Sequence, residues 1–208
     1  NLTNENKAQQ IILSRSQDYF DQTAVPKIGG AQVTVSDSLG HQFTFTEKVA
    51  LSGIYVWEPS VQQPTIGKVG TTFTLNVKWQ NETLTAKAKM NRVPPIDSIL
   101  YQYDEATGRQ SANDSPKNGY DAQFYARDMN GVGDCYRVKT YRNGVLFNDP
   151  INLTLIYDAG FQKGAMTDGL MFILPIRRSI SPSLYVENDK IRVELWSISE
   201  DEFNFYSQ

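Results

Sequence analysis

Apolar and polar residues alternate with a period of two along most of this 208-residue chain. The segments "AQVTVSD" and "HQFTFTE" each carry two large apolar residues two positions apart: Val33, Val35, Phe43 and Phe45. Such alternation gives a strand one apolar and one polar face, so it predicts antiparallel sheets with one face in water. Asp37 and Gly40 in the intervening "DSLG" are typical of a hairpin turn.

A second pair of alternating segments follows around "QNE" at 80–82. The apolar residues of the first segment are Phe73, Leu75, Val77 and Trp79, and those of the second are Leu84, Ala86, Ala88 and Met90. The other face of the second segment carries Thr83, Thr85, Lys87 and Lys89. We therefore expect a hairpin that turns its lysines to water and its apolar residues to a core.

Two consecutive prolines, Pro94 and Pro95, interrupt this pattern near the middle of the chain. Neither can donate a backbone hydrogen bond to a sheet, and each drives the residue before it toward an extended conformation. The strand pattern then resumes at "IDSILYQYDE". We predict an all-β chain of two β-sandwich domains, residues 1–93 and 94–208, joined at an extended link. The second domain should carry a long surface loop at Ala106–Gly119, which is polar and rich in glycine, proline and asparagine.

Three local signals refine the second domain. "GLMFILPI" at Gly169–Ile176 is an apolar run of strand length, and we interpret it as a buried strand. Asn143-Gly144 is a strong signal for a two-residue hairpin turn. Ser199 with Glu202 three residues later forms a capping box, which predicts a short helix near the end of the chain.

Composition excludes several classes of function. The formal net charge of −3 gives no basic field for a phosphate backbone, so we predict no nucleic-acid binding. No apolar run approaches the roughly 20 residues of a membrane-spanning helix. Cys135 is the only cysteine and His41 the only histidine, so neither a disulfide nor a cysteine- or histidine-rich metal site can form. We predict no cofactor.

The residues that carry reactive groups have simpler structural interpretations. His41 follows a turn glycine and reads as an exposed turn residue, and Cys135 opens an alternating strand as a small buried apolar residue. No "GxSxG" nucleophile elbow is present. "DMNGVGD" at Asp128–Asp134 spaces acids as a calcium loop would, but Val132 replaces an oxygen ligand and no bidentate Glu follows. We interpret this segment as a strand connection.

Aromatic residues offer the best candidate for a binding surface. Most of them should be core or cross-strand residues, because aromatics are favoured in strands. Exposed rings bind sugars and partner proteins well, however. The tyrosines beside the long loop are the ones we choose, since a loop on a rigid sheet is a common recognition device; they are Tyr101, Tyr103, Tyr120 and Tyr125.

The order of segments resembles a known family. The sequences "IILSRSQDYF", "GAQVTVSDSLGHQFTFTE", "SGIYVW", "VGTTFTLNVKW" and "VPPIDSI", followed by "GDCYRVKTYRNG" and "IRVELWSISEDEF", are similar to the Bacteroidetes outer-membrane lipoproteins of domain-of-unknown-function family 4249. The double proline before Ile-Asp-Ser, at Val93–Ile99, is the most specific part. The resemblance implies a first domain that is immunoglobulin-like or prealbumin-like, lacking a strand before Asn1, and a second β-sandwich domain that is cut short at its end.

The resemblance also implies a cellular setting. We expect an exported lipoprotein, anchored to the outer membrane through a lipid on a segment absent from this chain, and acting beside a TonB-dependent receptor. The expected role is non-enzymatic capture or gating of a glycan or another small ligand. A structural or adhesive surface module is the alternative, and a glycan or peptide hydrolase built from loop carboxylates ranks last.

Overall fold

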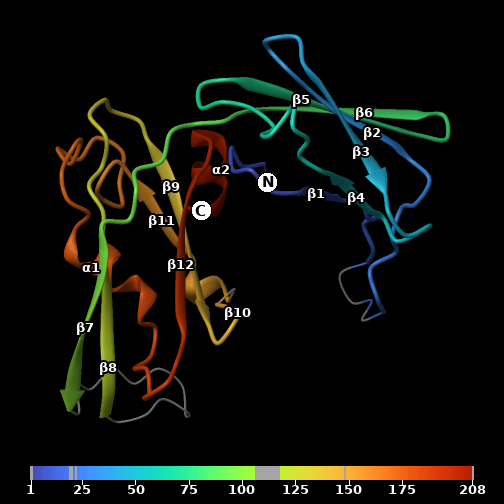
Figure 1. The fold of residues 1–208 in the computed structure, drawn as a ribbon. Helices are drawn as coiled ribbons and strands as arrows, with labels where there is room; N and C mark the ends of the chain where they lie inside the picture. The colour runs from blue at the N-terminus through green and yellow to red at the C-terminus, as the bar shows by residue number, and fades with distance from the viewer. Residues whose placement is uncertain (1, 19–20, 22, 106–117, 148, 208) are drawn as a thin grey trace. The chain divides into compact units, whose positions relative to one another are not determined.

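The computed structural model describes residues 2–18, 21, 23–105, 118–147 and 149–207 (Figure 1). Strands account for 41% of the chain and helices for 9%, which confirms the all-β class. The chain divides into two compact units, Asn1–Asn91 and Arg92–Gln208. The division falls two residues before the boundary expected from the prolines, and Pro94 and Pro95 themselves lie in no strand. The long loop expected at Ala106–Gly119 falls for the most part outside the described residues.

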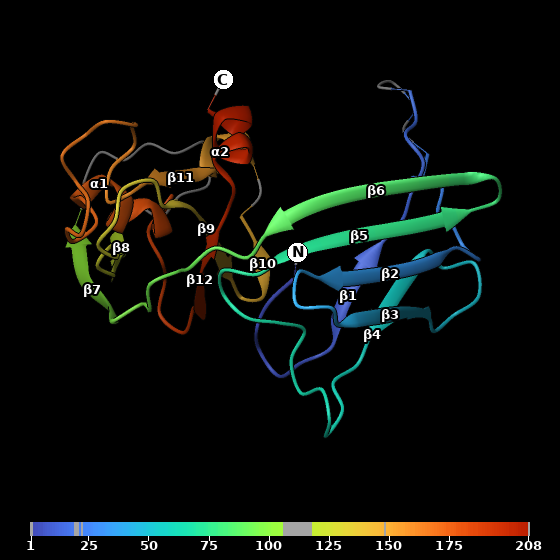
Figure 2. The ribbon, with the colours of Figure 1, turned by 90° about the horizontal axis from the view of Figure 1, so that it is seen from above.

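The first unit is one antiparallel sheet of six strands in the order β1-β4-β3-β2-β5-β6. The strands are β1 (Gln9–Ile12), β2 (Gln32–Asp37), β3 (Gln42–Glu47), β4 (Ile54–Trp57), β5 (Thr72–Trp79) and β6 (Glu82–Lys89). Only two residue pairs join β3 to β4, namely Thr46 with Val56 and Glu47 with Tyr55. The sheet bends at this short pairing, so β1 and β4 run at an angle to β2 and β3 (Figure 2).

The bent sheet encloses the core that the alternation predicts. The buried apolar residues are Val33, Val35, Phe43, Phe45, Tyr55, Trp57, Ile66, Phe73 and Val77. Tyr55 satisfies its hydroxyl by donating to Ile28 O at 3.0 Å and accepting from Ala31 N at 2.8 Å. The β2–β3 turn also forms as expected, with Gly40 at φ +94° and Asp37 Oδ1 accepting from the amide of Leu39.

The expected burial of one face of β6 is wrong. All eight residues of β6 are exposed, and Leu84 retains 63% of its surface. β6 is the outermost strand of this sheet and pairs only with β5. Alternation reports that one face is apolar, but burial also needs a second layer opposite that face.

The second unit contains two sheets. β7 (Ser98–Glu105) and β8 (Asn118–Tyr125) form an antiparallel ribbon. In the other sheet β9 (Cys135–Arg142) is central: it pairs with β12 (Ile191–Ser197) along one edge and with β10 (Val145–Leu146) and β11 (Thr154–Tyr157) along the other. The β9–β10 hairpin turns at Asn143-Gly144, with φ of +52° and +85°, as the sequence predicts.

One core joins these sheets, as expected for a layered β domain. It contains Ala122, Phe124, Ala126, Tyr136, Val138, Ile156, Ala159, Phe172, Ile176, Ile180 and Tyr185. The segment 170–185 lies along the free edge of β8. Tyr120 and Tyr185 exchange backbone hydrogen bonds of 2.8 and 2.9 Å, and the Ser181 hydroxyl bonds both the N–H and the C=O of Ala122.

The interpretation of Gly169–Ile176 as a strand is wrong. Only Met171 forms a β-bridge, with Arg127, and the chain then turns into α1 (Leu174–Arg177) and the 3-10 helix η2 (Arg178–Ile180). Pro175 lies in the first turn of α1, where its missing N–H costs nothing. Phe172 and Ile176 both reach the core, Phe172 from the segment before α1 and Ile176 from α1 itself.

The remaining helices are short. η1 (Pro150–Asn152) precedes β11, and α2 (Glu200–Tyr206) follows β12. The Ser199 hydroxyl accepts from Glu202 N at 3.1 Å, so the expected N-cap of α2 is confirmed. Phe203 on α2 packs against Tyr157 and Cys135 in a small second cluster. Among the residues that the structure describes, none of the helices has the length and apolar character needed to span a bilayer.

The first unit allows a direct test of burial against alternation. Phe45→Ala should lower the free energy of unfolding by about 3–5 kcal/mol because it opens a cavity in the core. Leu84→Ala, at an equally apolar position of the pattern, should cost less than about 1 kcal/mol because its side chain is already in water. Denaturant unfolding followed by tryptophan fluorescence measures both, and equal losses would contradict the exposure of β6.

Candidate binding surface

Three of the four candidate tyrosines form one cluster on the β7–β8 ribbon, which we call the tyrosine surface: Tyr101, Tyr103 and Tyr120. The register places Tyr103 directly across from Tyr120, and Tyr101 across from Ala122 on the same face. The Tyr120 ring meets Tyr101 and Tyr103 edge to face, with ring centroids 5.6 and 5.4 Å apart. This is the geometry that aromatic pairs prefer.

The tyrosine surface consists of one ring held against the core and two rings exposed to water. Tyr120 is half-buried and packs against the core, and its backbone N–H and C=O both form hydrogen bonds with Tyr185. Tyr101 and Tyr103 are 72% and 56% exposed. β7 is also the outer strand of the ribbon, since it pairs with β8 alone among the described strands. Two large rings therefore face water from an ordered strand.

Tyr125 does not belong to this cluster. It lies across from Ser98, on the opposite face of the ribbon from Tyr120. The guanidinium of Arg177, on α1, lies 4.7 Å from its ring centroid, so a cation-π contact covers it. Sequence spacing places Tyr120 and Tyr125 on opposite faces of one strand, and the contact with Arg177 appears only once the fold brings α1 to that face.

Two acidic residues of the ribbon, Asp121 and Asp104, have different surroundings. Asp121 is buried and faces Gln102 across the ribbon, and its Oδ2 lies 2.8 Å from Arg178 Nη2 on η2. Asp104 lies across from Gly119. The Asp121 carboxylate therefore ties β8 to η2, which is a structural role.

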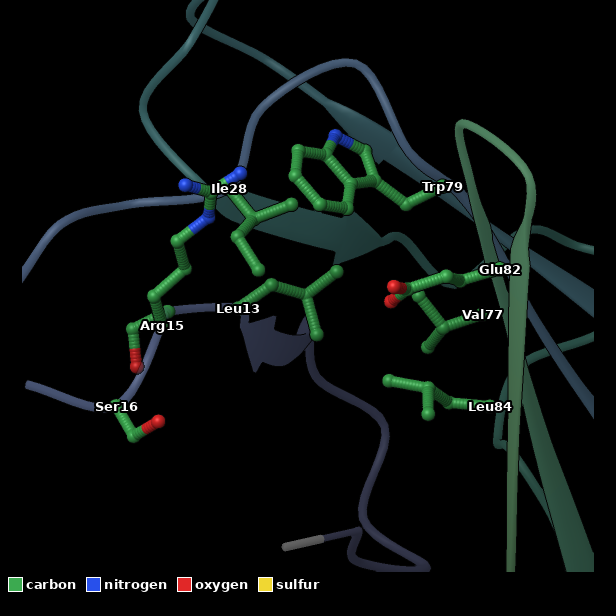
Figure 3. A pocket seen from close by; sticks show the side chains of 9 residues that line it. Leu13, Arg15, Ser16, Ile28, Val77, Trp79, Glu82 and Leu84 are labelled. Atoms are coloured by element: carbon green, nitrogen blue, oxygen red, sulfur yellow. The ribbon is translucent and has the colours of Figure 1, made fainter.

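The first unit contains a separate hollow of about 470 Å³ (Figure 3). Leu13, Ile28, Val77 and Leu84 give it apolar walls, and the Arg15 guanidinium lies 4.8 Å from the Trp79 ring centroid at its rim. Ser14, Ser16 and Glu82 complete the lining. Sequence reasoning missed this hollow, because it assigned Leu84 to a filled core. The one available signal was the strict alternation that turns Val77, Trp79 and Leu84 to the same side.

His41 and Cys135 lie as their sequence context predicts. His41 is exposed in the β2–β3 turn, where its Nδ1 lies 2.8 Å from Asp37 Oδ2. Burial acts to raise the pKa of Asp37, but hydrogen bonds from the His41 ring and from the amides of His41 and Leu39 hold that pKa below its usual value. Cys135 is buried, and burial raises the pKa of its thiol to about 11. Such a thiol is a poor nucleophile.

A group of carboxylates is the only one among the described residues whose geometry fits a metal ion. One oxygen each from Asp128, Asp158 and Asp168 lies within 4.8 Å of the others. The segment Asp128–Asp134, which resembles a calcium loop, supplies Asp128 to this group of carboxylates. Asp134 of the same segment pairs with Arg92 instead. Asp158 and Asp168 have no sequence spacing that links them to Asp128, so no sequence pattern predicts this group.

Comparison with known proteins gives one match. The family model described as Domain of unknown function (DUF4249) matches residues 1–208. No curated protein and no solved structure matches the chain.

The tyrosine surface should show measurable coupling between its rings. A double-mutant cycle with Tyr103→Leu and Tyr120→Leu should give a coupling free energy of about 0.5–1 kcal/mol, because each substitution removes the same edge-to-face contact. The matched cycle with Tyr101→Leu and Tyr125→Leu joins residues on opposite faces and should be additive within about 0.3 kcal/mol. Urea unfolding measures both cycles; coupling of the same size in the two would refute the arrangement.

The environment of Cys135 predicts slow thiol chemistry. A thiol pKa of about 11 instead of the ordinary value of 9.0 lowers the thiolate fraction at pH 8 by about 100-fold. Iodoacetamide should therefore alkylate the folded chain at least about 100-fold more slowly than the urea-unfolded chain, and the folded rate should rise with pH up to about 11. Mass spectrometry follows the modified fraction, and rapid alkylation of the folded chain at pH 8 would contradict this burial.

Proposed function

Because this chain belongs to the family described as Domain of unknown function (DUF4249), we propose that it is a non-enzymatic binding protein of the cell envelope. It contacts its ligand through the tyrosine surface of the β7–β8 ribbon. The observation that carries this proposal is the exposure of two rings: Tyr101 is 72% exposed and Tyr103 is 56% exposed. Both lie on one ordered strand, and both contact the ring of Tyr120 edge to face.

The chemistry of the tyrosine surface favours a ligand with a flat apolar face and polar edges. Each tyrosine ring buries a large area on contact, and its hydroxyl can accept or donate a hydrogen bond at the rim. Tyrosine has few rotatable bonds, so it loses little conformational entropy on binding, and these two are already part of an ordered strand. A pyranose ring in a glycan has such faces, which makes a glycan the ligand class that we favour.

A non-enzymatic role is supported by the state of the residues that would do chemistry. The Cys135 thiol is buried with a raised pKa, and the His41 ring is engaged with Asp37 in an exposed turn. Asp121 is paired with Arg178. These groups stabilise turns and strand contacts, and Asp121 lies on the opposite face of β8 from Tyr120.

The cellular setting rests on the family resemblance. We propose attachment to the outer membrane through a lipid outside this chain, beside a TonB-dependent receptor that takes up the captured ligand. Crosslinking in the native membrane followed by mass spectrometry tests this. Recovery of such a receptor supports the proposal, whereas a cytoplasmic protein with no receptor crosslink would overturn it.

A glycan-array screen tests the binding role. Binding by the unchanged chain should fall by at least about tenfold in Tyr101→Ala and in Tyr103→Ala, because exposed aromatic anchors commonly carry 1–2 kcal/mol or more. Phe205→Ala is the matched control: Phe205 is 71% exposed, but it lies on α2. Its binding should be unchanged.

Two outcomes would argue against this role. Loss of binding in all three variants would point to non-specific adsorption through exposed rings. Absence of any glycan signal, together with self-association that disappears in Tyr101→Ala, would favour the alternative of a structural or adhesive module.

A further inference from the structure

Three loops of the second unit bring carboxylates to one point. Asp128 lies three residues beyond the end of β8, Asp158 directly follows β11, and Asp168 lies in the segment that leads to α1. One oxygen from each lies within 4.8 Å of the other two. Asp128 and Asp158 are 3% and 1% exposed, while Asp168 reaches the surface. The cluster therefore has a buried floor and one side open to solvent.

Backbone N–H groups fix the orientation of all three carboxylates. The donors are Gly133 and Asp134 to Asp158 Oδ1 at 2.8 and 3.0 Å, Gly131 to Asp168 Oδ1 at 2.8 Å, and Gly169 to Asp128 Oδ2 at 3.0 Å. Gly131, Gly133 and Gly169 all have positive φ, at +118°, +106° and +69°. The loops thus hold the acids together in a geometry that these glycines permit.

One buried carboxylate oxygen of this cluster has no hydrogen-bond partner within the described part of the chain. It is Asp158 Oδ2, and the other oxygen of the same carboxylate accepts hydrogen bonds from two amides. An unpaired buried carboxylate oxygen is costly, so its presence indicates that something else satisfies it.

Neighbouring positive charges do not neutralise the cluster. Arg92 directs its guanidinium to Asp134 and to the carbonyls of Met129 and Gly131, and Arg127 Nη1 donates to Gly169 O at 3.2 Å. Within the described part of the chain, no lysine or arginine pairs with Asp128, Asp158 or Asp168. Tyr136 donates to Asp128 Oδ1 at 2.6 Å, but it adds no positive charge. Three like charges at this separation repel one another strongly away from bulk water.

We propose that Asp128, Asp158 and Asp168 bind a calcium ion. Carboxylate and hydroxyl oxygens are the ligands of hard divalent cations, and glycine-rich loops with several aspartates are how proteins assemble them. Three carboxylates at one point suit Ca²⁺, because Mg²⁺ usually keeps several waters and takes only one or two carboxylates. Water would complete the coordination on the open side.

The proposed ion would bind the second unit together rather than take part in the tyrosine surface. It would join the loop after β8, the turn after β11 and the segment before α1, whereas Tyr120 lies near the opposite end of β8. Binding only to the folded state would raise the stability of this unit.

Calorimetric titration of the EDTA-stripped full chain tests the proposal. Calcium should bind at one saturable site and raise the unfolding temperature by at least ~5 °C at 100 times its dissociation constant. Asp158→Asn and Asp168→Asn keep an oxygen for their amide donors but lose a charge, and each should weaken calcium binding by at least about tenfold. Asp97→Asn removes an exposed acid elsewhere in the same unit and should leave binding unchanged.

A second measurement separates lost binding from lost folding. In EDTA, Asp158→Asn and Asp168→Asn should unfold at the same temperature as the unchanged chain or higher, because each removes one of three repelling charges. Magnesium titrated in place of calcium should bind at least about tenfold more weakly. Failure of millimolar calcium to bind or to raise the unfolding temperature would overturn the proposal. Calcium binding that persists unchanged in both aspartate variants would also overturn it.

Discussion

β8 is the element on which the second unit depends, because both of its edges and much of both faces are occupied. Its backbone bonds β7 on one edge, while Tyr120 and Ala122 bond segment 170–185 on the other. Ala122 and Phe124 lie in the core on one face, and Asp121 pairs with Arg178 on the other. A strand whose N–H and C=O groups are satisfied on both sides cannot shift register without losing all of these contacts. Its two ends are therefore fixed points, and the tyrosine surface and the carboxylate cluster lie at those ends.

The outer strands behave differently. β7 and β6 each pair with one neighbour within the described structure, and each exposes apolar side chains, among them Tyr101, Tyr103 and Leu84. Exposed apolar residues on an outer strand are a hazard for aggregation, so natural proteins usually place charges there, as Lys87 and Lys89 do on β6. β7 has no lysine or arginine along its length. The charged residues of β7, Asp104 and Glu105, are acidic and lie at its end. Large rings exposed along the rest of an outer strand are typical of a surface that meets a partner.

Buried acids in the second unit are stabilised in two ways. Asp121 is neutralised by Arg178, and its pairing holds η2 against β8. Asp128 and Asp158 pair with no lysine or arginine of the described segments; they accept hydrogen bonds from amides and, for Asp128, from a tyrosine hydroxyl. Burial raises the pKa of Asp128, while the hydrogen bonds from Tyr136 and from the Gly169 amide lower it only in part. Asp121 thus belongs to a structural ion pair, whereas Asp128 and Asp158 belong to a cluster without a paired positive charge.

The sequence by itself determined the hairpins β2–β3 and β5–β6, the Asn143-Gly144 hairpin and the capped helix α2, because each follows from the nearest few residues. Period-two alternation, missing proline N–H groups and turn chemistry act locally and need no knowledge of the fold. The same reasoning failed for Gly169–Ile176, where packing along β8 outweighed an apolar run, and for Leu84, which lines an open hollow instead of a filled core. Only the tertiary structure decided that Arg177 covers Tyr125, and that Asp158 and Asp168 meet Asp128. Those contacts join segments that are far apart in the chain. They form only when the β7–β8 ribbon packs on the β9 sheet, so no local pattern predicts them.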